Sequence, residues 1–300
     1  MLEEFDKKFN WLGIIFHLRE SVVPVIWRRV LGVMLFAVII NLAYHQGWPV
    51  SYNFTYNLIP SIVLGLLLVF RTNTAYSRFW EGCRAWGTLK IYSRILARDI
   101  STIIPVNSPQ EQQEKIYYIQ LVPVMMSSIR THLRNESLDQ RGQLILQQGH
   151  LEELATVQHR PLRIINWFSS YFYRNYQQGK ISDKLFTEFG STLNSIVQAL
   201  GGCERILNTP MPKAYNIHLK HLLVIYCLGL PIQLVAQLHW WIIPIAGITS
   251  FALLGIEAIG LEIEDPFGYD PNDLPLDSYC QKIYDEVDEL LAYETRSTLS

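Results

Sequence analysis

The sequence contains 300 residues with a formal net charge of -2, and 49% of its residues are hydrophobic whereas 17% are charged. Soluble domains usually carry more charge, about 25%. No basic block or basic stripe is present, which argues against a nucleic-acid partner. The four cysteines show neither CxxC nor metal-ligand spacing, so we expect reduced thiols that serve packing. They are Cys83, Cys203, Cys227 and Cys280.

The first long uncharged stretch follows an N-terminal segment, residues 1–27. This segment is mixed in charge and has no long apolar core, so we expect no signal peptide. No Asp, Glu, Lys or Arg occurs between Arg29 and Arg71. That length is about twice the roughly 20 residues that one helix needs to cross a bilayer. Turn-forming and interfacial residues, HQGWPVSY at 45–52, divide it. We therefore predict a first transmembrane hairpin over residues 28–76.

A second uncharged stretch lies between Lys220 and Glu257 and predicts another transmembrane hairpin over residues 218–262. Its turn is expected at 238–244, in the sequence LHWWIIP. Basic residues flank both hairpins and are missing from both turns, which places both termini and the intervening region in the cytoplasm. The alternative is a soluble protein with two buried hairpins. It is disfavoured because soluble helices of this length normally show a polar stripe.

The region between the hairpins, residues 77–217, is predicted to be a cytoplasmic helical domain. Apolar residues recur there at helical spacing, and no stretch alternates as a strand would. Residues 263–300 are predicted to form a C-terminal cytoplasmic tail with an acidic amphipathic helix at 276–293. The predicted fold is therefore an all-α membrane protein with four transmembrane helices and a large cytoplasmic helical region. The helical pattern is strongest over 111–134, 160–178 and 181–208.

The second predicted span carries a stripe of large apolar side chains. Ile62, Leu66 and Phe70 are spaced i, i+4 and i+8, so they drift about 80° around a helix and cover about 12 Å of it. Ser61 and Gly65 form a small-xxx-small pair that lets helices approach closely. Copies of this helix around an axis would turn three apolar rings inward, which is a constriction that can gate by dewetting. The alternative is an ordinary lipid-facing surface, since any such helix has apolar residues at i+4.

The stretch RTNTAYSRFWEGCRAWG at 71–87 follows this span. An interfacial belt explains its arginines and tryptophans, but explains Asn73 and Glu81 less well. The stretch resembles a motif of the bestrophin family, with further matches in CERILNTPMPKAY at 203–215 and IEDPFGYDPNDLP at 263–275. The resemblance covers nearly the whole chain and is closest to prokaryotic and plastid members. The matching residues are Phe70, Arg71, Thr72, Asn73, Tyr76, Arg78, Phe79, Trp80, Glu81, Arg84, Trp86 and Gly87.

The resemblance implies a homopentamer with one central pore, a multi-pass protein of a cell inner membrane or a thylakoid-type membrane. Its function would be passive conduction of small anions, chiefly chloride and also bicarbonate. The narrow neck of the family matches Ile62, Leu66 and Phe70. Animal members often carry Phe at the middle ring, where this chain has Leu66. Some bacterial members pass cations, so a cation-selective channel is the alternative.

The resemblance also implies a second constriction at the cytoplasmic exit, made by one apolar ring early in the helix before CERI. Phe186 matches best, and Leu185 and Phe189 are close to it. Plain core packing is the alternative for each of the three.

Animal members of the family bind calcium in an acidic loop after the fourth span. Asp265, Asp270 and Asp273 lie near the corresponding position, and oxygen ligands from a turn suit calcium. However, Pro271 and Asn272 interrupt the acidic run. We therefore do not expect calcium or any other cofactor to be required, and turn formation by DPND is the simpler interpretation.

An acidic residue, Glu257, lies near the cytoplasmic end of the fourth predicted span. An intramembrane acid usually has a function or a partner. We expect its partner to be an arginine of the 71–84 cluster.

Other function classes receive little support. A secondary transporter needs discontinuous helices with polar groups at the midplane, for which only Asn41, Pro60 and the break at 229–231 speak. The eight histidines are dispersed, and His218 and His221 have no acid beside them, so we expect no enzyme. A structural scaffold is an alternative that only a current measurement can separate from a channel.

Overall fold

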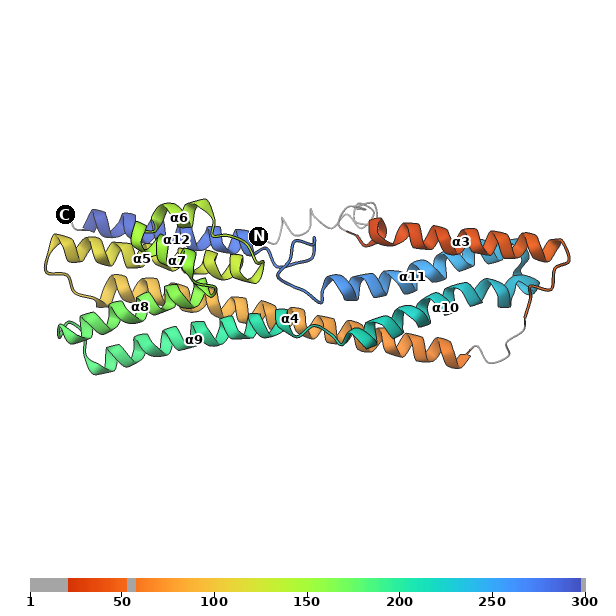
Figure 1. Cartoon of the computed structure of the whole chain (residues 1–300), viewed down its shortest axis with the longest axis horizontal. Helices are drawn as coiled ribbons and strands as arrows, with labels where there is room; N and C mark the ends of the chain where they lie inside the picture. Colours follow the sequence, from red (N-terminus) through yellow and green to blue (C-terminus); the bar gives the residue numbers. More distant parts are fainter. Residues whose placement is uncertain (1–20, 53–57, 298–300) are drawn as a thin grey trace, which may run out of the picture. The chain divides into compact units, whose positions relative to one another are not determined.

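The computed structural model describes residues 21–52 and 58–297, and the described residues are mostly helical, joined by turns and irregular segments, with no strand among them. They form two compact units. The first unit comprises the chain up to Phe79, Pro210–Asp265 and Asp270–Asn272. The second comprises Trp80–Thr209, Pro266–Tyr269 and the chain from Asp273 onward. Figure 1 shows the helices of each unit.

The first unit is built from the helices in which the spans are predicted. In it α3 packs against α10 and α11, and α10 packs against α11 (Figure 1). A glycine permits the close approach of α3 and α11, because a Cβ on Gly247 would lie 2.9 Å from Met34 Sδ. The elements are α3 (Val23–His45), the beginning of α4 (Leu58–Ile103), α10 (Lys213–Leu238), the 3-10 helix η2 (His239–Trp241) and α11 (Ile242–Glu262).

The two predicted hairpin turns meet in this unit. His45 at the end of α3 stacks on His239, with ring centroids 5.8 Å apart, and on Trp240 at 5.7 Å. The chain reverses at His239, whose φ of 47° is in the left-handed region. Gly47 after α3 has a φ of 81°, a conformation that favours glycine. Turn residues and aromatic rings therefore end α3 and α10 where the sequence predicts it.

Two stretches of the described residues are long and apolar enough to cross a membrane, Val23–His45 and Lys213–Glu262. The second stretch contains both α10 and α11, which η2 separates. The second predicted span, at the beginning of α4, is not among these stretches. Residues 53–57, which precede α4, lie outside the described part of the chain.

The second unit contains the remaining helices, and side-chain caps define several of their starts. Ser108 Oγ accepts a hydrogen bond from the Glu111 N–H at the start of α5, and Ser182 Oγ accepts from Leu185 N–H at α9. The three helices predicted in this region are confirmed. The elements are the rest of α4, α5 (Pro109–Leu133), α6 (Gln140–Ile145), α7 (Gln148–Thr156), α8 (Arg160–Gln177), α9 (Asp183–Asn208) and α12 (Leu276–Ser297).

Aromatic side chains form much of the core of the second unit. The rings of Tyr118 on α5 and Tyr171 on α8 stack with centroids 3.9 Å apart. Phe172 on α8 stacks on Phe189 of α9 at 4.1 Å. Such pairs contribute about 0.5–1.5 kcal/mol beyond the burial of their area. They hold α8 against both α5 and α9, while α12 packs against α5 (Figure 1).

Candidate pore-lining helix and its surroundings

The beginning of α4 has one buried face and one exposed face. Leu64 and Leu68 are 3% and 2% exposed and pack against α10. Ile62, Leu66 and Phe70, the residues predicted to form the neck, are 60%, 53% and 56% exposed. Burial of the two leucines fixes the rotation of the helix, so that the predicted stripe points away from the rest of its unit. In a single chain this apolar stripe has no cover among the described residues.

The small residues predicted to pack neighbouring helices lie beside this stripe. Ser61 and Gly65 are both half-buried. A Cβ added to Gly65 would meet no described atom within 4 Å, so nothing in the chain itself requires a glycine there. The space is open to the close approach of another helix. The packing role of the pair stays a prediction.

The arginine that ends the stripe is turned into the protein. Arg71 is 1% exposed, and its Nη1 donates a hydrogen bond of 2.6 Å to Asn216 Oδ1. Its Nη2 lies 3.6 Å from Glu264 Oε2. The other oxygen of Glu264 accepts a bond of 2.9 Å from the Met211 N–H. One buried ion pair therefore joins the start of α10 and the three stretches that resemble the bestrophin family, 71–87, 203–215 and 263–275. This contact was not predicted from the sequence.

The other motif residues of the first unit lie near the end of this helix segment. Arg78 Nε donates to the Glu264 carbonyl oxygen at 3.2 Å, which adds a second link to the chain after α11. Asn73 and Tyr76 are exposed. Their exposure leaves them available to solvent, lipid or another copy of the chain.

The remaining motif residues belong to the second unit. Trp86 is buried, whereas Trp80 and Arg84 are exposed. Glu81 forms an ion pair with Arg205 on α9. The motif therefore combines a core residue, a surface pair and exposed side chains, and it is not one compact site.

The partner expected for Glu257 is wrong. Its Oε2 lies 3.8 Å from Nη1 of Arg29 on α3, not near an arginine of the 71–84 cluster. Glu257 is buried on α11, and α11 packs against α3, so its side chain meets the residues of that helix. Arg71 is engaged by Glu264 instead. Sequence alone does not say which helices are neighbours, which is why the expectation failed.

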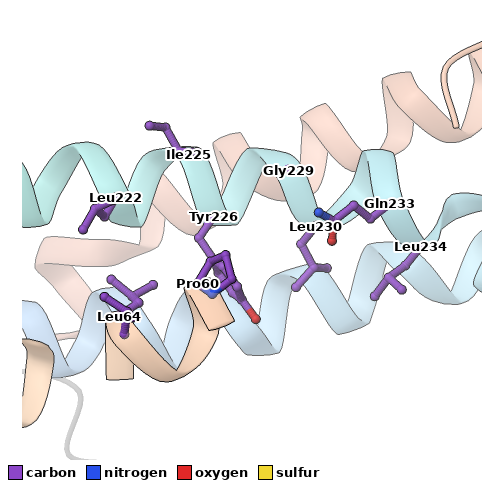
Figure 2. Close-up of a pocket in the computed structure, with 10 residues that line it drawn as sticks. Pro60, Leu64, Leu222, Ile225, Tyr226, Gly229, Leu230, Gln233 and Leu234 are labelled. Carbon is purple, nitrogen blue, oxygen red and sulfur yellow. The ribbon is translucent and has the colours of Figure 1, made fainter. Parts of the chain in front are cut away.

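An apolar groove of about 480 Å³ lies between the beginning of α4 and α10. Figure 2 shows Pro60 and Leu64 on one side and Leu222, Tyr226 and Leu230 on the other. The tyrosine and Gln233 are the main polar side chains of the lining. A groove of this composition suits an apolar chain or a neighbouring helix rather than a hydrated ion.

The three residues predicted for the cytoplasmic constriction differ in burial. Phe189 is 2% exposed and stacks on Phe172 in the core of the second unit. Phe186 is half-buried and stacks on Tyr176, with ring centroids 5.0 Å apart. Leu185 is also half-buried. Of the three, Leu185 and Phe186 retain surface that another copy of the chain could meet, and their role stays a prediction.

The aspartates predicted as calcium ligands are divided between the two units. Asp265 and Asp270 are exposed in the first unit, and Asp273 is half-buried in the second. Asp273 belongs to a turn in which the Leu274 N–H donates to the Pro266 carbonyl oxygen at 2.9 Å. Their carboxylates occur in no described group of three or more metal-ligand atoms. Calcium binding at these aspartates stays an alternative that we do not expect.

One group of polar side chains in the second unit was not predicted from the sequence. His132 and His159 each place Nε2 2.8 Å from Oε1 of Glu204. The three residues are 72 and 45 positions apart along the chain. No local spacing could have revealed the group, because it forms only when α5, α8 and α9 pack together.

Comparison with known proteins gives one consistent family. The family described as Bacterial/Fungal Bestrophin protein matches residues 4–289. A voltage-dependent anion channel-forming protein of Nostoc sp. is 44% identical over 94% of this chain and 92% of its own length. The corresponding protein YneE of Escherichia coli (strain K12) is 30% identical over 94% of this chain and 91% of its own length.

Solved structures indicate the same family. A bacterial bestrophin homologue from Klebsiella pneumoniae superimposes with a TM-score of 0.81 at 27% identity, over 88% of this chain and 98% of that chain. The predicted all-α fold is confirmed. The match of the full family profile, the identity to the curated relatives and the shared helical architecture lead to one conclusion: the chain is a membrane protein of the bestrophin family.

Proposed function

We propose that the protein is a bestrophin-type channel that passes small anions passively through a pore lined by the beginning of α4. The observation that carries this proposal is the orientation of that helix. Its buried leucines hold Ile62, Leu66 and Phe70 outward as a continuous apolar stripe. Relatives over nearly the full length of the chain are named as voltage-dependent anion channel-forming proteins, which supports the same activity here.

The pore requires several copies of the chain, because one helix cannot surround an ion. We propose a homopentamer, in which five stripes face one axis and form three apolar rings. Gly65 supports this assembly, since the space beside it is open to a second helix. The rings would hold back water and ions in the closed state and would wet to conduct. Neither calcium nor another cofactor takes part in such a gate.

The stripe carries no charge, so ion sign must be set by groups outside the neck. Arg71 follows the stripe directly, but it is buried and faces Glu264 rather than the surface. It therefore does not supply a free positive ring at the end of the neck. Chloride and bicarbonate are the proposed ions. Because no free positive ring at the end of the neck would repel cations, cation conduction is the second candidate. Both termini are proposed to be cytoplasmic, in an inner or thylakoid-type membrane.

Planar-bilayer recordings of the purified protein test the proposal. A conductance is expected, and its reversal potential in a KCl gradient should follow the chloride equilibrium potential. Following the potassium potential instead would establish the cation channel. Alanine at Ile62, Leu66 or Phe70 should raise the open probability, because a ring with less apolar surface wets more easily.

The matched control is Ile225→Ala on α10, which is 67% exposed and does not belong to the stripe. It should gate like the unsubstituted protein. If alanine at all three stripe positions gives the same gating as Ile225→Ala, the neck is not formed by these residues.

A further inference from the structure

Three helices of the second unit bring two imidazoles and one carboxylate together. His132 lies near the end of α5, His159 is the N-cap residue of α8, and Glu204 lies on α9. The two Nε2 atoms are each 2.8 Å from Glu204 Oε1, and the imidazole centroids are 4.5 Å apart. We propose that these three side chains bind a divalent transition-metal ion, for which zinc is the best-suited probe. This site is independent of the proposed neck.

The donor set fits such an ion. Two imidazole nitrogens and one carboxylate oxygen are a common ligand combination for Zn²⁺, with bonds of about 2.0–2.2 Å. Tetrahedral geometry at that bond length separates the ligand atoms by about 3.3 Å. The hydrogen-bonded nitrogen and oxygen atoms are now 2.8 Å apart, and all three ligand atoms lie within 4.8 Å of one another. A side-chain movement of about half an ångström would admit the ion.

The two arginines next to this group in the sequence bind other partners and not the Glu204 carboxylate. Arg205, next to Glu204 in the sequence, forms its ion pair with Glu81. Arg160, next to His159, donates from Nη1 to the Glu136 carbonyl oxygen at 2.8 Å. The three ligands are partly exposed, with 26–38% of each side chain accessible, so an ion can enter and water can complete its coordination.

Binding the ion requires a change of tautomer at both histidines, because a carboxylate only accepts hydrogen bonds and each neutral ring therefore carries its proton on Nε2, toward Glu204. The same tautomer of His159 leaves its Nδ1 free to accept a hydrogen bond of 3.3 Å from the Leu162 N–H. The ion needs the lone pair of each Nε2. In each ring the proton therefore moves to Nδ1 through solvent and the ring stays neutral, and at His159 the long bond that caps α8 is exchanged for a metal bond. The bound ion would join the ends of α5 and α8 to α9.

The experiment uses the full-length protein without an affinity tag, purified in detergent and stripped with a chelator. Zinc chloride is titrated by calorimetry, and Co²⁺ is added separately to record the visible absorption of the bound ion. We expect one ion per chain, an imidazole-containing coordination sphere in the Co²⁺ spectrum, and a higher melting temperature with zinc. Glu204→Gln and the double variant His132→Ala/His159→Ala should weaken zinc binding more than tenfold.

The matched control is His218→Ala/His221→Ala, which removes the exposed i, i+3 histidine pair of α10 and should leave binding unchanged. The proposal is overturned if the unsubstituted protein binds no stoichiometric ion, which would leave a hydrogen-bonded histidine pair only. It is also overturned if the control variant abolishes binding while Glu204→Gln retains it. The Co²⁺ spectrum of the unsubstituted protein decides the question even if a variant fails to fold.

Discussion

At the scale of single residues, the buried pair of Arg71 and Glu264 connects distant parts of the first unit. A buried ion pair need not stabilise a protein relative to apolar residues, but removal of one partner leaves the other charge buried and uncompensated. The side chain of Glu264 is only 10% exposed. The sequence gives the charge of both residues but not their contact, because the contact depends on how α4 lies against the chain that follows α11.

Arg71→Met should therefore lower the stability of the protein strongly, by about 3–5 kcal/mol, because Glu264 loses its counter-charge. The double variant Arg71→Met/Glu264→Met should recover much of the loss. Thermal unfolding in detergent, followed by tryptophan fluorescence, measures both. Arg94→Met is the control, since its ion pair with Glu286 is partly exposed, at 45% and 33% of the two side chains, and should contribute at most about 1 kcal/mol. If the loss of stability in the double variant equals the sum of the losses in Arg71→Met and Glu264→Met, the two side chains do not form a pair.

At the scale of elements, α4 illustrates how a neighbouring segment decides which glycines are required. Gly82 is buried, and a Cβ on it would lie 2.8 Å from Pro266 Cγ and 3.3 Å from Phe267 Cζ. The proline ring cannot rotate away. Gly87 lies five residues further along the same helix, and a Cβ there would meet nothing described within 4 Å. The two glycines provide a matched pair with opposite expectations.

Gly82→Ala should destabilise the protein by about 1–3 kcal/mol through overpacking against Pro266. Gly87→Ala should be neutral or stabilise it by up to about 1 kcal/mol, because alanine is the better helix former. Melting temperatures of the two variants in the same detergent give the comparison. Equal effects of the two substitutions would mean that the turn after α11 does not press against α4 at Gly82.

The elements themselves were largely predictable from the sequence. Apolar periodicity predicted α5, α8 and α9, and the turn-forming residues predicted the ends of α3 and α10. What periodicity does not contain is the identity of neighbouring helices. For this reason the partner of Glu257 was assigned to the wrong helix, and the group of His132, His159 and Glu204 was missed. The exposed stripe of Ile62, Leu66 and Phe70 could be predicted because its residues are close in sequence and share one helix, whereas its role as a neck stays a prediction.

At the scale of the whole molecule, the single chain leaves large apolar side chains exposed on several helices of the first unit. Lipid can cover such a surface, and so can a second copy of the chain. The difference is accessibility to water, since a pore-facing residue is wetted when the channel opens and a lipid-facing residue is not. The stripe of α4 and the lining of the apolar groove on α10 offer the comparison, with Leu66 53% and Ile225 67% exposed.

Leu66→Cys should react with a charged, water-soluble thiosulfonate during recording and lose or change its current, because modified thiols from neighbouring copies would crowd the proposed neck. Ile225→Cys should be unaffected, because a thiol in lipid forms no thiolate for the reaction. Two native thiols give little background: burial raises the pKa of Cys203 and of Cys280 to about 12, so neither ionises appreciably near neutral pH. Cys83 is half-buried and is replaced by serine in both variants. Block of the Ile225→Cys channel with no effect on Leu66→Cys would place water along α10 instead, and the axis of the pore would have to be sought there.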